Sequence, residues 1–220
     1  MEVGAKKIAL WAVLVSVICG ILLGITVVGP WVSKKRQNWN SIKNDPPIDQ
    51  TVDIFIQNPS YQGISIETTE ANSEFPSNLL ENQQVIDQVI KFIIEPGVLR
   101  DLPDNFGQFH ELTTLTIFQN RLTTLPPSIG NIAPLETITI LDNPMAYLPD
   151  EIGNLVNLRT LVVNGGYLET LPPTIGNLTQ LSVLDLRNNN ISILPEEIKL
   201  LKNLKYLYLG GNPIDPVIAH

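Results

Sequence analysis

The sequence predicts an α/β-type solenoid of short parallel strands, preceded by one transmembrane helix. Residues 8–32 contain no charged side chain, and an uncharged run of this length is typical of a membrane span. Further along, the chain repeats itself every 23 residues, in units that begin at Leu102, Leu125, Leu148, Leu171 and Leu194. A fixed period of roughly 20–29 residues with regular leucine spacing is typical of stacked repeats.

The first element is an N-terminal tail and anchor over residues 1–36, with the span at 8–32. At about 1.5 Å per residue, a helix of this length exceeds the ~30 Å hydrocarbon core and can span it with some tilt. Basic residues flank both ends, at Lys6–Lys7 and Lys34–Arg36. Aromatic side chains, which favour the membrane interface, lie near both ends: Trp11 and Trp31. A cleaved signal peptide is the alternative, but its apolar region is shorter, at about 7–15 residues. We therefore expect an uncleaved signal anchor and a single-pass membrane protein.

Small residues recur every four positions along this span: Ala12, Ser16, Gly20 and Gly24. On a helix they form one stripe, which lets a second backbone approach closely. The stripe favours a homodimer through the transmembrane helix; the alternative is that this face meets lipid. Basic residues number two before the span and three directly after it, so the charge pattern leaves open which side holds the repeats.

Residues 37–76 are rich in Asn, Gln, Ser, Pro and acidic side chains, and they predict a mostly extended tether. Two stretches within it, Val52–Ile56 and Ile64–Ile66, have the composition of short strands. They allow a hairpin around Asn58-Pro59.

One degenerate unit is expected before the five full repeats, as an N-terminal cap over residues 77–101. Counting back one period from the first repeat places apolar residues at the leucine positions: Leu79, Phe92, Ile94 and Leu99. Ser77 is a suitable cap for a helix, whose predicted apolar face includes Val89 and Ile90. The cap therefore combines a helix with a strand.

Residues 102–220 form the five repeats. In each unit an apolar, other, apolar triplet predicts a strand with one buried face, as at Leu115–Ile117 and Leu161–Val163. Three residues cannot form a strand alone, so the neighbouring units must supply the pairing, and each unit adds one parallel strand. A proline at the second position, such as Pro126, starts the return arc with its fixed φ. The result is a solenoid whose turns contact only their neighbours.

Two further positions recur in these units. An asparagine follows the strand in four of them: Asn120, Asn143, Asn189 and Asn212. An inward amide can satisfy backbone groups that the turn buries. The middle unit has Gly166 there, so we expect a looser loop. A glycine occupies the sixth position in four units, whereas the fifth unit has Lys199. We expect its convex side to turn differently.

The units resemble the leucine-rich repeat family, in the variety with an LPxxIGNLxxLxxLxLxxNxL unit. The resemblance implies a horseshoe segment with short parallel strands on its concave face, and a role in protein–protein interaction. Many extracellular relatives cap their solenoids with disulfides. This chain departs from that pattern, because its only cysteine, Cys19, lies in the predicted span.

Side chains that point out of the strands are expected to form columns down the concave face, because successive turns stack at about 4.8 Å. The candidate binding residues lie in these columns: Thr116, Phe118, Thr139, Leu141, Val162, Asn164, Asp185, Arg187, Tyr206 and Tyr208. Phe118, Leu141 and Val162 are apolar where solvent is expected, and aromatic residues and arginine are enriched in binding sites. The alternative is that β-branched and aromatic residues merely suit strands.

The residues offer little chemistry for catalysis. Two histidines, His110 and His220, and one thiol provide neither a metal cluster nor a nucleophile pair, so we expect no enzyme activity, no cofactor and no metal. The net charge of −8 argues against a nucleic-acid partner. The sequence predicts a membrane-anchored repeat protein that binds a protein ligand through its concave face, as a receptor-like protein or in signalling through a partner. The alternative is a structural or adhesion protein of the cell envelope.

Overall fold

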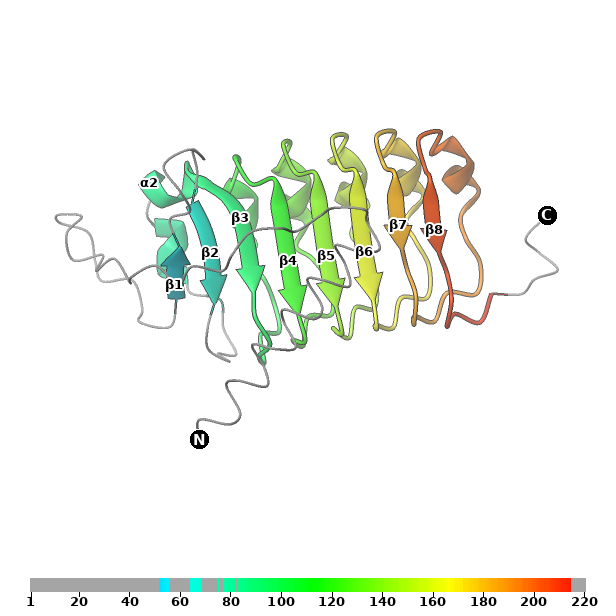
Figure 1. Cartoon of the computed structure of the whole chain (residues 1–220), viewed down its shortest axis with the longest axis horizontal. Coiled ribbons are helices and arrows are strands. Elements are labelled where there is room, and N and C mark those ends of the chain that lie inside the picture. The colour runs from blue at the N-terminus through cyan, green and yellow to red at the C-terminus, as the bar shows by residue number, and fades with distance from the viewer. Residues whose placement is uncertain (1–51, 56–63, 69–74, 76, 82, 215–220) are drawn as a thin grey trace, which may run out of the picture. The chain divides into compact units, whose positions relative to one another are not determined.

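Eight strands form a single sheet in chain order, β1 to β8 (Figure 1). This computed structural model describes residues 52–55, 64–68, 75, 77–81 and 83–214. The chain divides into two units, Met1–Gln37 and Asn38–His220, and every described residue lies in the second. The predicted span over residues 8–32 and its stripe of small residues (Ala12, Ser16, Gly20 and Gly24) lie outside the described residues. Within the described part of the chain, no helix is long and apolar enough to cross a membrane.

Each repeat contributes one strand to the sheet. The strands are β3 (Val89–Ile94), β4 (Thr114–Phe118), β5 (Thr137–Leu141), β6 (Thr160–Asn164), β7 (Val183–Asp185) and β8 (Tyr206–Tyr208). All of them pair in parallel, and partners in neighbouring full repeats are one period apart, as in Thr116 with Thr139 and Thr139 with Val162. The parallel solenoid predicted from the period is therefore confirmed.

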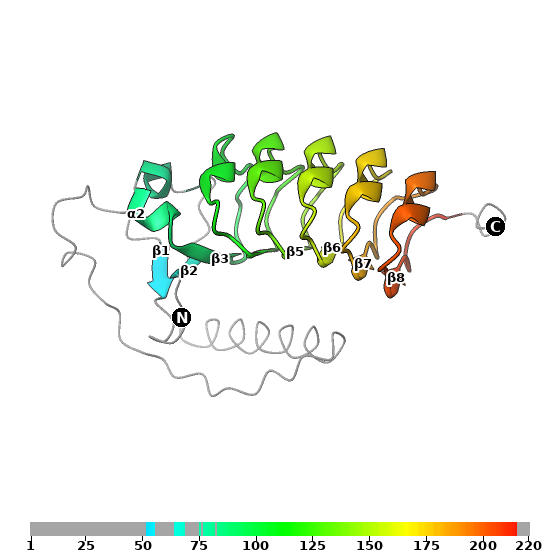
Figure 2. The same ribbon diagram turned by 90° about the horizontal axis from the view of Figure 1, so that it is seen from above.

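Short 3-10 helices form the opposite side of the stack (Figure 2). They are η3 (Phe106–Gln108), η4 (Pro127–Asn131), η5 (Asp150–Asn154), η6 (Pro173–Asn177) and η7 (Glu196–Leu200). Each of η4 to η7 follows a proline with φ between −65° and −68°, the value that the proline ring imposes. The last helix, η7, keeps this geometry, so the different turn expected from Lys199 is not present.

Glycine at the sixth position lets these helices stack closely. A Cβ on Gly130, Gly153 or Gly176 would lie 2.5–2.9 Å from a backbone carbonyl oxygen of the next helix, and Gly107 is even closer to Ser128. Real Cβ atoms essentially never approach so closely, so only glycine fits without moving the helices apart. Lys199 stands in η7, the last helix of the described stack.

The core lies between the sheet and the 3-10 helices. Leu115, Ile117, Leu161 and similar inward side chains are fully buried, or nearly so, in every full repeat. Four phenylalanines pack together at the N-terminal end of this core, with ring centroids 5.2–5.7 Å apart: Phe75, Phe92, Phe106 and Phe109. Tilted and edge-to-face aromatic pairs at this spacing contribute stability beyond simple burial. The cluster therefore joins the cap to the first full repeat.

The sheet extends further towards the N-terminus than the predicted boundary at residue 77. β1 (Val52–Phe55) pairs antiparallel with β2 (Ile64–Thr68), and β2 pairs in parallel with β3. The cap helix is short and broken, with η2 at Ser77–Glu81 and α2 at Gln83–Ile86. Val89 and Ile90, expected on the helix, belong to β3 instead. Pairing of β3 with both neighbouring strands outweighs the local helical pattern.

The asparagines after the strands satisfy buried backbone groups of the preceding unit, as predicted. The Asn189 amide oxygen accepts a hydrogen bond from the Leu168 N–H at 3.2 Å. Its amide nitrogen donates to the carbonyl oxygen of Val163 at 2.7 Å. The amide oxygens of Asn120, Asn143 and Asn212 likewise accept an N–H from a residue 21 positions earlier. These bonds tie each turn to the one before it.

The loop at Gly166 is closed tightly, so the expectation of a looser loop was wrong. The Met145 N–H, which would face an asparagine at this position, donates to the carbonyl oxygen of Asn143 at 2.7 Å. The Gly166 N–H donates to the Asn188 carbonyl oxygen at 3.1 Å. A Cβ on Gly166 would lie 2.9 Å from both the Asn143 carbonyl oxygen and the Asn189 amide oxygen. The loop therefore has no room for a side chain here.

One residue after the strand adopts a left-handed conformation in every full repeat. The residues recur every 23 positions, with φ between 43° and 79°: Gln119, Asp142, Gly165, Asn188 and Gly211. Glycine adopts this conformation without steric cost, and Asn and Asp tolerate it better than most residues. The position turns the chain sharply away from the sheet.

Candidate binding surface

Strand register aligns the predicted candidate residues across the sheet. The central column runs through Thr116, Thr139, Val162, Asp185 and Tyr208, each paired with the next. Phe118 pairs with Leu141 and Leu141 with Asn164, so a second column lies beside the first. Successive residues of a strand point to opposite faces, so these side chains face away from the buried set. We call this outer side of the sheet the concave face.

The candidates differ in how much surface they offer. Tyr206 is 52% exposed, and Thr116, Phe118, Thr139, Leu141, Asn164, Arg187 and Tyr208 do not belong to the buried set. Val162 and Asp185 are only 7% and 5% exposed. The expectation that Val162 stands open to solvent is therefore wrong, and neither residue presents much contact area.

Asp185 is buried because Arg187 folds over it. The Arg187 Nε atom lies 2.9 Å and 3.1 Å from the two carboxylate oxygens, and Nη2 makes a further contact. The Arg187 backbone N–H also donates to Asp185 Oδ1 at 3.1 Å. A buried carboxylate with a charged partner and several donors is well compensated. Asp185 therefore holds Arg187 in place, while the Arg187 side chain keeps 37% of its area exposed.

Two tyrosines complete this end of the concave face. The Arg187 guanidinium carbon lies 5.2 Å from the centroid of the Tyr208 ring, within range of a cation–π interaction. The Tyr206 and Tyr208 rings are parallel within 2°, with centroids 6.3 Å apart. Arg187, Tyr208 and Tyr206 thus form a continuous planar surface at β7 and β8.

The other end of the concave face is more apolar. Phe118 and Leu141 are partly exposed on β4 and β5, next to the threonines of the central column. Asn164 on β6 is engaged within the protein, since its amide oxygen accepts a hydrogen bond from Asn188 Nδ2 at 3.0 Å. The concave face therefore changes from apolar at β4 to polar and aromatic at β8.

The described residues do not assemble a metal site. Nowhere in the described ranges do three or more His, Cys, Asp or Glu side chains come together as metal ligands would. His110 Nε2 lies 3.1 Å from Asp87 Oδ1, and its Nδ1 lies 2.7 Å from the Gln108 carbonyl oxygen. These contacts link the first full repeat to the end of α2. His220 lies outside the described residues.

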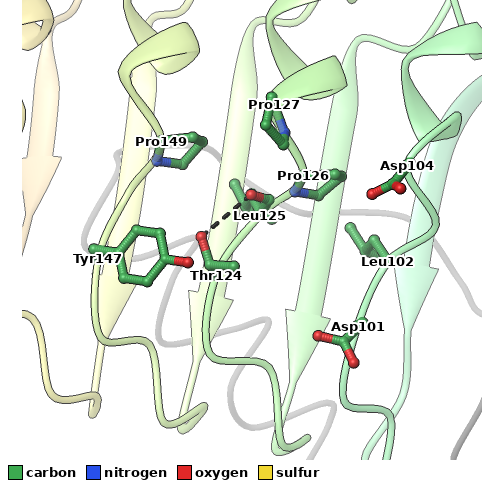
Figure 3. Close-up of a pocket in the computed structure, with 9 residues that line it drawn as sticks. All are labelled: Asp101, Leu102, Asp104, Thr124, Leu125, Pro126, Pro127, Tyr147 and Pro149. Atoms are coloured by element: carbon green, nitrogen blue, oxygen red, sulfur yellow. Dashed lines mark hydrogen bonds between the residues drawn. The ribbon is translucent and has the colours of Figure 1, made fainter.

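A second surface feature was not foreseen from the sequence. A shallow hollow of about 250 Å³ lies on the return arc, where three successive repeats meet (Figure 3). It is lined by Asp101, Leu102, Asp104, Thr124, Leu125, Pro126, Pro127, Tyr147 and Pro149. The signal in the sequence is the residue before each repeat's first leucine, which changes from Asp101 to Thr124 to Tyr147.

A family model described as a leucine-rich repeat region matches residues 146–216. Among solved structures, the leucine-rich repeat domain of the type III effector XopL is 29% identical, with a TM-score of 0.61, over 70% of this chain and 53% of that one. The Arabidopsis receptor kinase HAESA, in complex with the peptide hormone IDA and the co-receptor SERK1, is 25% identical, with a TM-score of 0.58, over 72% and 28%. A TDR receptor is 27% identical, with a TM-score of 0.56, over 64% and 25%. No curated protein sequence is significantly similar to the chain.

The chain therefore spans between a quarter and about half of the length of these solved chains. The matched region, the similar structures and the parallel sheet together support a leucine-rich repeat protein with a solenoid fold. This fold is generally a non-enzymatic scaffold for protein–protein interaction.

Proposed function

We propose that the solenoid binds a protein or peptide partner across its concave face, and that residues 8–32 hold the protein at a membrane. One observation carries the binding proposal. Partly exposed apolar, aromatic and arginine side chains lie in order across five neighbouring strands, at Phe118, Leu141, Arg187, Tyr206 and Tyr208.

Rigid presentation makes these side chains suitable for binding. Each one stands on a strand that is paired on both sides, except on β8, and Arg187 is additionally held by Asp185. Groups that are ordered before binding lose less conformational entropy when a partner arrives. Tyrosine and arginine are also the residue types that most often dominate binding energy. A partner that crosses the strands would place an apolar group on Phe118 and a hydrogen-bond acceptor near Arg187.

The similar solved structures support the same use. HAESA is a receptor kinase solved with a peptide hormone and a co-receptor, and the TDR structure is also that of a receptor. A receptor-like role for this chain, with any signal passed on by a partner, would follow from such a peptide or protein contact.

A photo-crosslinking experiment tests the binding proposal. A photoreactive phenylalanine analogue replaces Phe118 in the full-length protein, and the matched control carries it at Val156, which is 51% exposed and outside the strands. We expect a covalent adduct with a partner from position 118 only. The adduct should disappear when Arg187→Ala and Tyr208→Ala are added. Adducts from position 156 alone would place binding elsewhere and favour a structural role.

The membrane proposal rests on the uncharged stretch over residues 8–32 and the basic residues on both sides of it. We expect the mature protein to keep this stretch and to resist carbonate extraction. A mature N-terminus after residue 25 would contradict this. A transmembrane association reporter with residues 6–36 tests the proposed homodimer, because Gly20→Ile with Gly24→Ile should reduce its signal.

A further inference from the structure

The hollow on the return arc lies apart from the concave face. None of its nine lining residues belongs to a strand. Asp101, Thr124 and Tyr147 occupy the same repeat position on three successive turns, since they are 23 residues apart. Turns stack at about 4.8 Å, so the outer two lie on the order of 10 Å apart.

The depth of the hollow comes from the small residue between two larger ones. Thr124 forms its floor and turns its hydroxyl group back towards its own chain, donating to the Leu125 carbonyl oxygen at 3.2 Å (Figure 3). Tyr147 stands on one side and is 56% exposed. Asp101 and Asp104 stand on the opposite side, and both are exposed. Pro126 and Pro149 add apolar walls.

The charge of the hollow is of one sign. Two lining residues are carboxylates and none is basic. Among the described residues, the ion pairs are His110 with Asp87 and Arg187 with Asp185, so Asp101 and Asp104 take part in neither. The next two turns have Thr170 and Ile193 in place of Asp101 and Tyr147, so this combination of carboxylates and aromatic ring occurs once in the stack.

We propose that this hollow binds an arginine side chain of a partner protein. A guanidinium group can form paired hydrogen bonds with carboxylates and stack on an aromatic ring, and arginine combines both properties on one planar group. Here Asp101 and Asp104 supply the carboxylates, and Tyr147 supplies the ring face. The aliphatic stem of the arginine would lie against Pro126 and Pro149. The contact is solvent-exposed, so a single arginine binds weakly, roughly in the millimolar range.

The test uses the full-length chain and a short synthetic peptide, acetyl-Ala-Pro-Arg-Pro-Ala-amide, with a photoreactive diazirine on one alanine. Citrulline and lysine versions of the peptide remove the charge or the planar fork. Labelled sites are mapped by mass spectrometry. We expect the arginine peptide to label residues 101–104, 124–127 and 147–149, with at least fivefold less labelling by the citrulline peptide and less by the lysine peptide.

Variants separate the site from general attraction to an acidic protein. Asp101→Asn with Asp104→Asn should reduce labelling at least fivefold, and Tyr147→Leu should reduce it several-fold. The matched control, Glu111→Gln with Glu169→Gln, removes the same charge from two exposed positions and should leave labelling unchanged. Equal labelling by the arginine and citrulline peptides, or equal loss in the control variant, would overturn the proposal. Equal labelling by the lysine peptide would overturn the assignment to arginine. The concave face is untouched in every variant, so this result is independent of the proposed function.

Discussion

Replacing Gly153 by alanine tests whether glycine sets the spacing of the 3-10 helices. Gly153 is buried in η5, and an added Cβ would lie 2.5 Å from the Thr174 carbonyl oxygen and 2.6 Å from the Thr174 Cβ. Ordinary contact begins at 3.4 Å, so the overlap with the oxygen is 3.4 − 2.5 = 0.9 Å. Neither the new Cβ nor the carbonyl oxygen can rotate away, so η5 and η6 must move apart.

The expected loss of stability follows from two opposing effects. Overpacking of this kind costs about 1–3 kcal/mol. Alanine also reduces the entropy of the unfolded chain, which returns about 0.4–1 kcal/mol. Because the overlap involves backbone, the first effect dominates, and we expect Gly153→Ala to lower the free energy of unfolding by about 2 kcal/mol.

Urea denaturation of the full-length chain, followed by circular dichroism, measures this change. The matched control is Gly210→Ala, where the nearest heavy atom to the new Cβ is Arg187 Cγ at 4.0 Å and the backbone is not left-handed. The control should be as stable as the parent or slightly more stable. If Gly153→Ala proves no less stable than Gly210→Ala, glycine at the sixth position does not control the stacking.

Three more substitutions probe other parts of the stack. Asn189→Ala should lower the free energy of unfolding by about 1–3 kcal/mol, because it leaves buried backbone groups of the preceding repeat unsatisfied; urea denaturation measures it. Leu161→Asp should unfold the repeats by placing an unpaired charge in the core, whereas Thr139→Asp should not; equal loss of circular dichroism in both would contradict the face assignment. Gly165→Ala should destabilise by about 1–2 kcal/mol, because φ is 78° there and the Cβ would meet Asp142; an unchanged melting temperature would refute this.

The repetition made the sheet and its faces predictable from sequence. The same apolar and polar positions recur in every unit, so inward residues such as Leu161 and outward residues such as Thr139 could be assigned before the structure was seen. The asparagines were predictable for a similar reason. A polar side chain at one fixed position beside a buried turn has few roles other than bonding to the backbone.

Features that depend on two or more neighbouring turns were not predictable in this way. Val89 and Ile90 fit a helix locally, but pairing with the adjacent strands places them in β3. Asp185 is outward-facing by pattern, yet Arg187 covers it. The hollow beside Tyr147 exists only because a threonine from one turn lies between larger side chains from two others. Each of these depends on side chains that meet only after the turns are stacked.

The hydrogen bonds of the asparagines have a consequence for how the protein folds. Those that cross between turns join residues 21–26 positions apart, in keeping with strand partners that lie one period apart. Contacts of such uniform, modest sequence separation keep loop-closure entropy low, so folding can begin at one turn and grow in both directions like a zipper. Inner turns have two stabilising neighbours and terminal turns have one. Backbone amides of β5 and β6 should therefore exchange with solvent most slowly, and protection should decline towards β8.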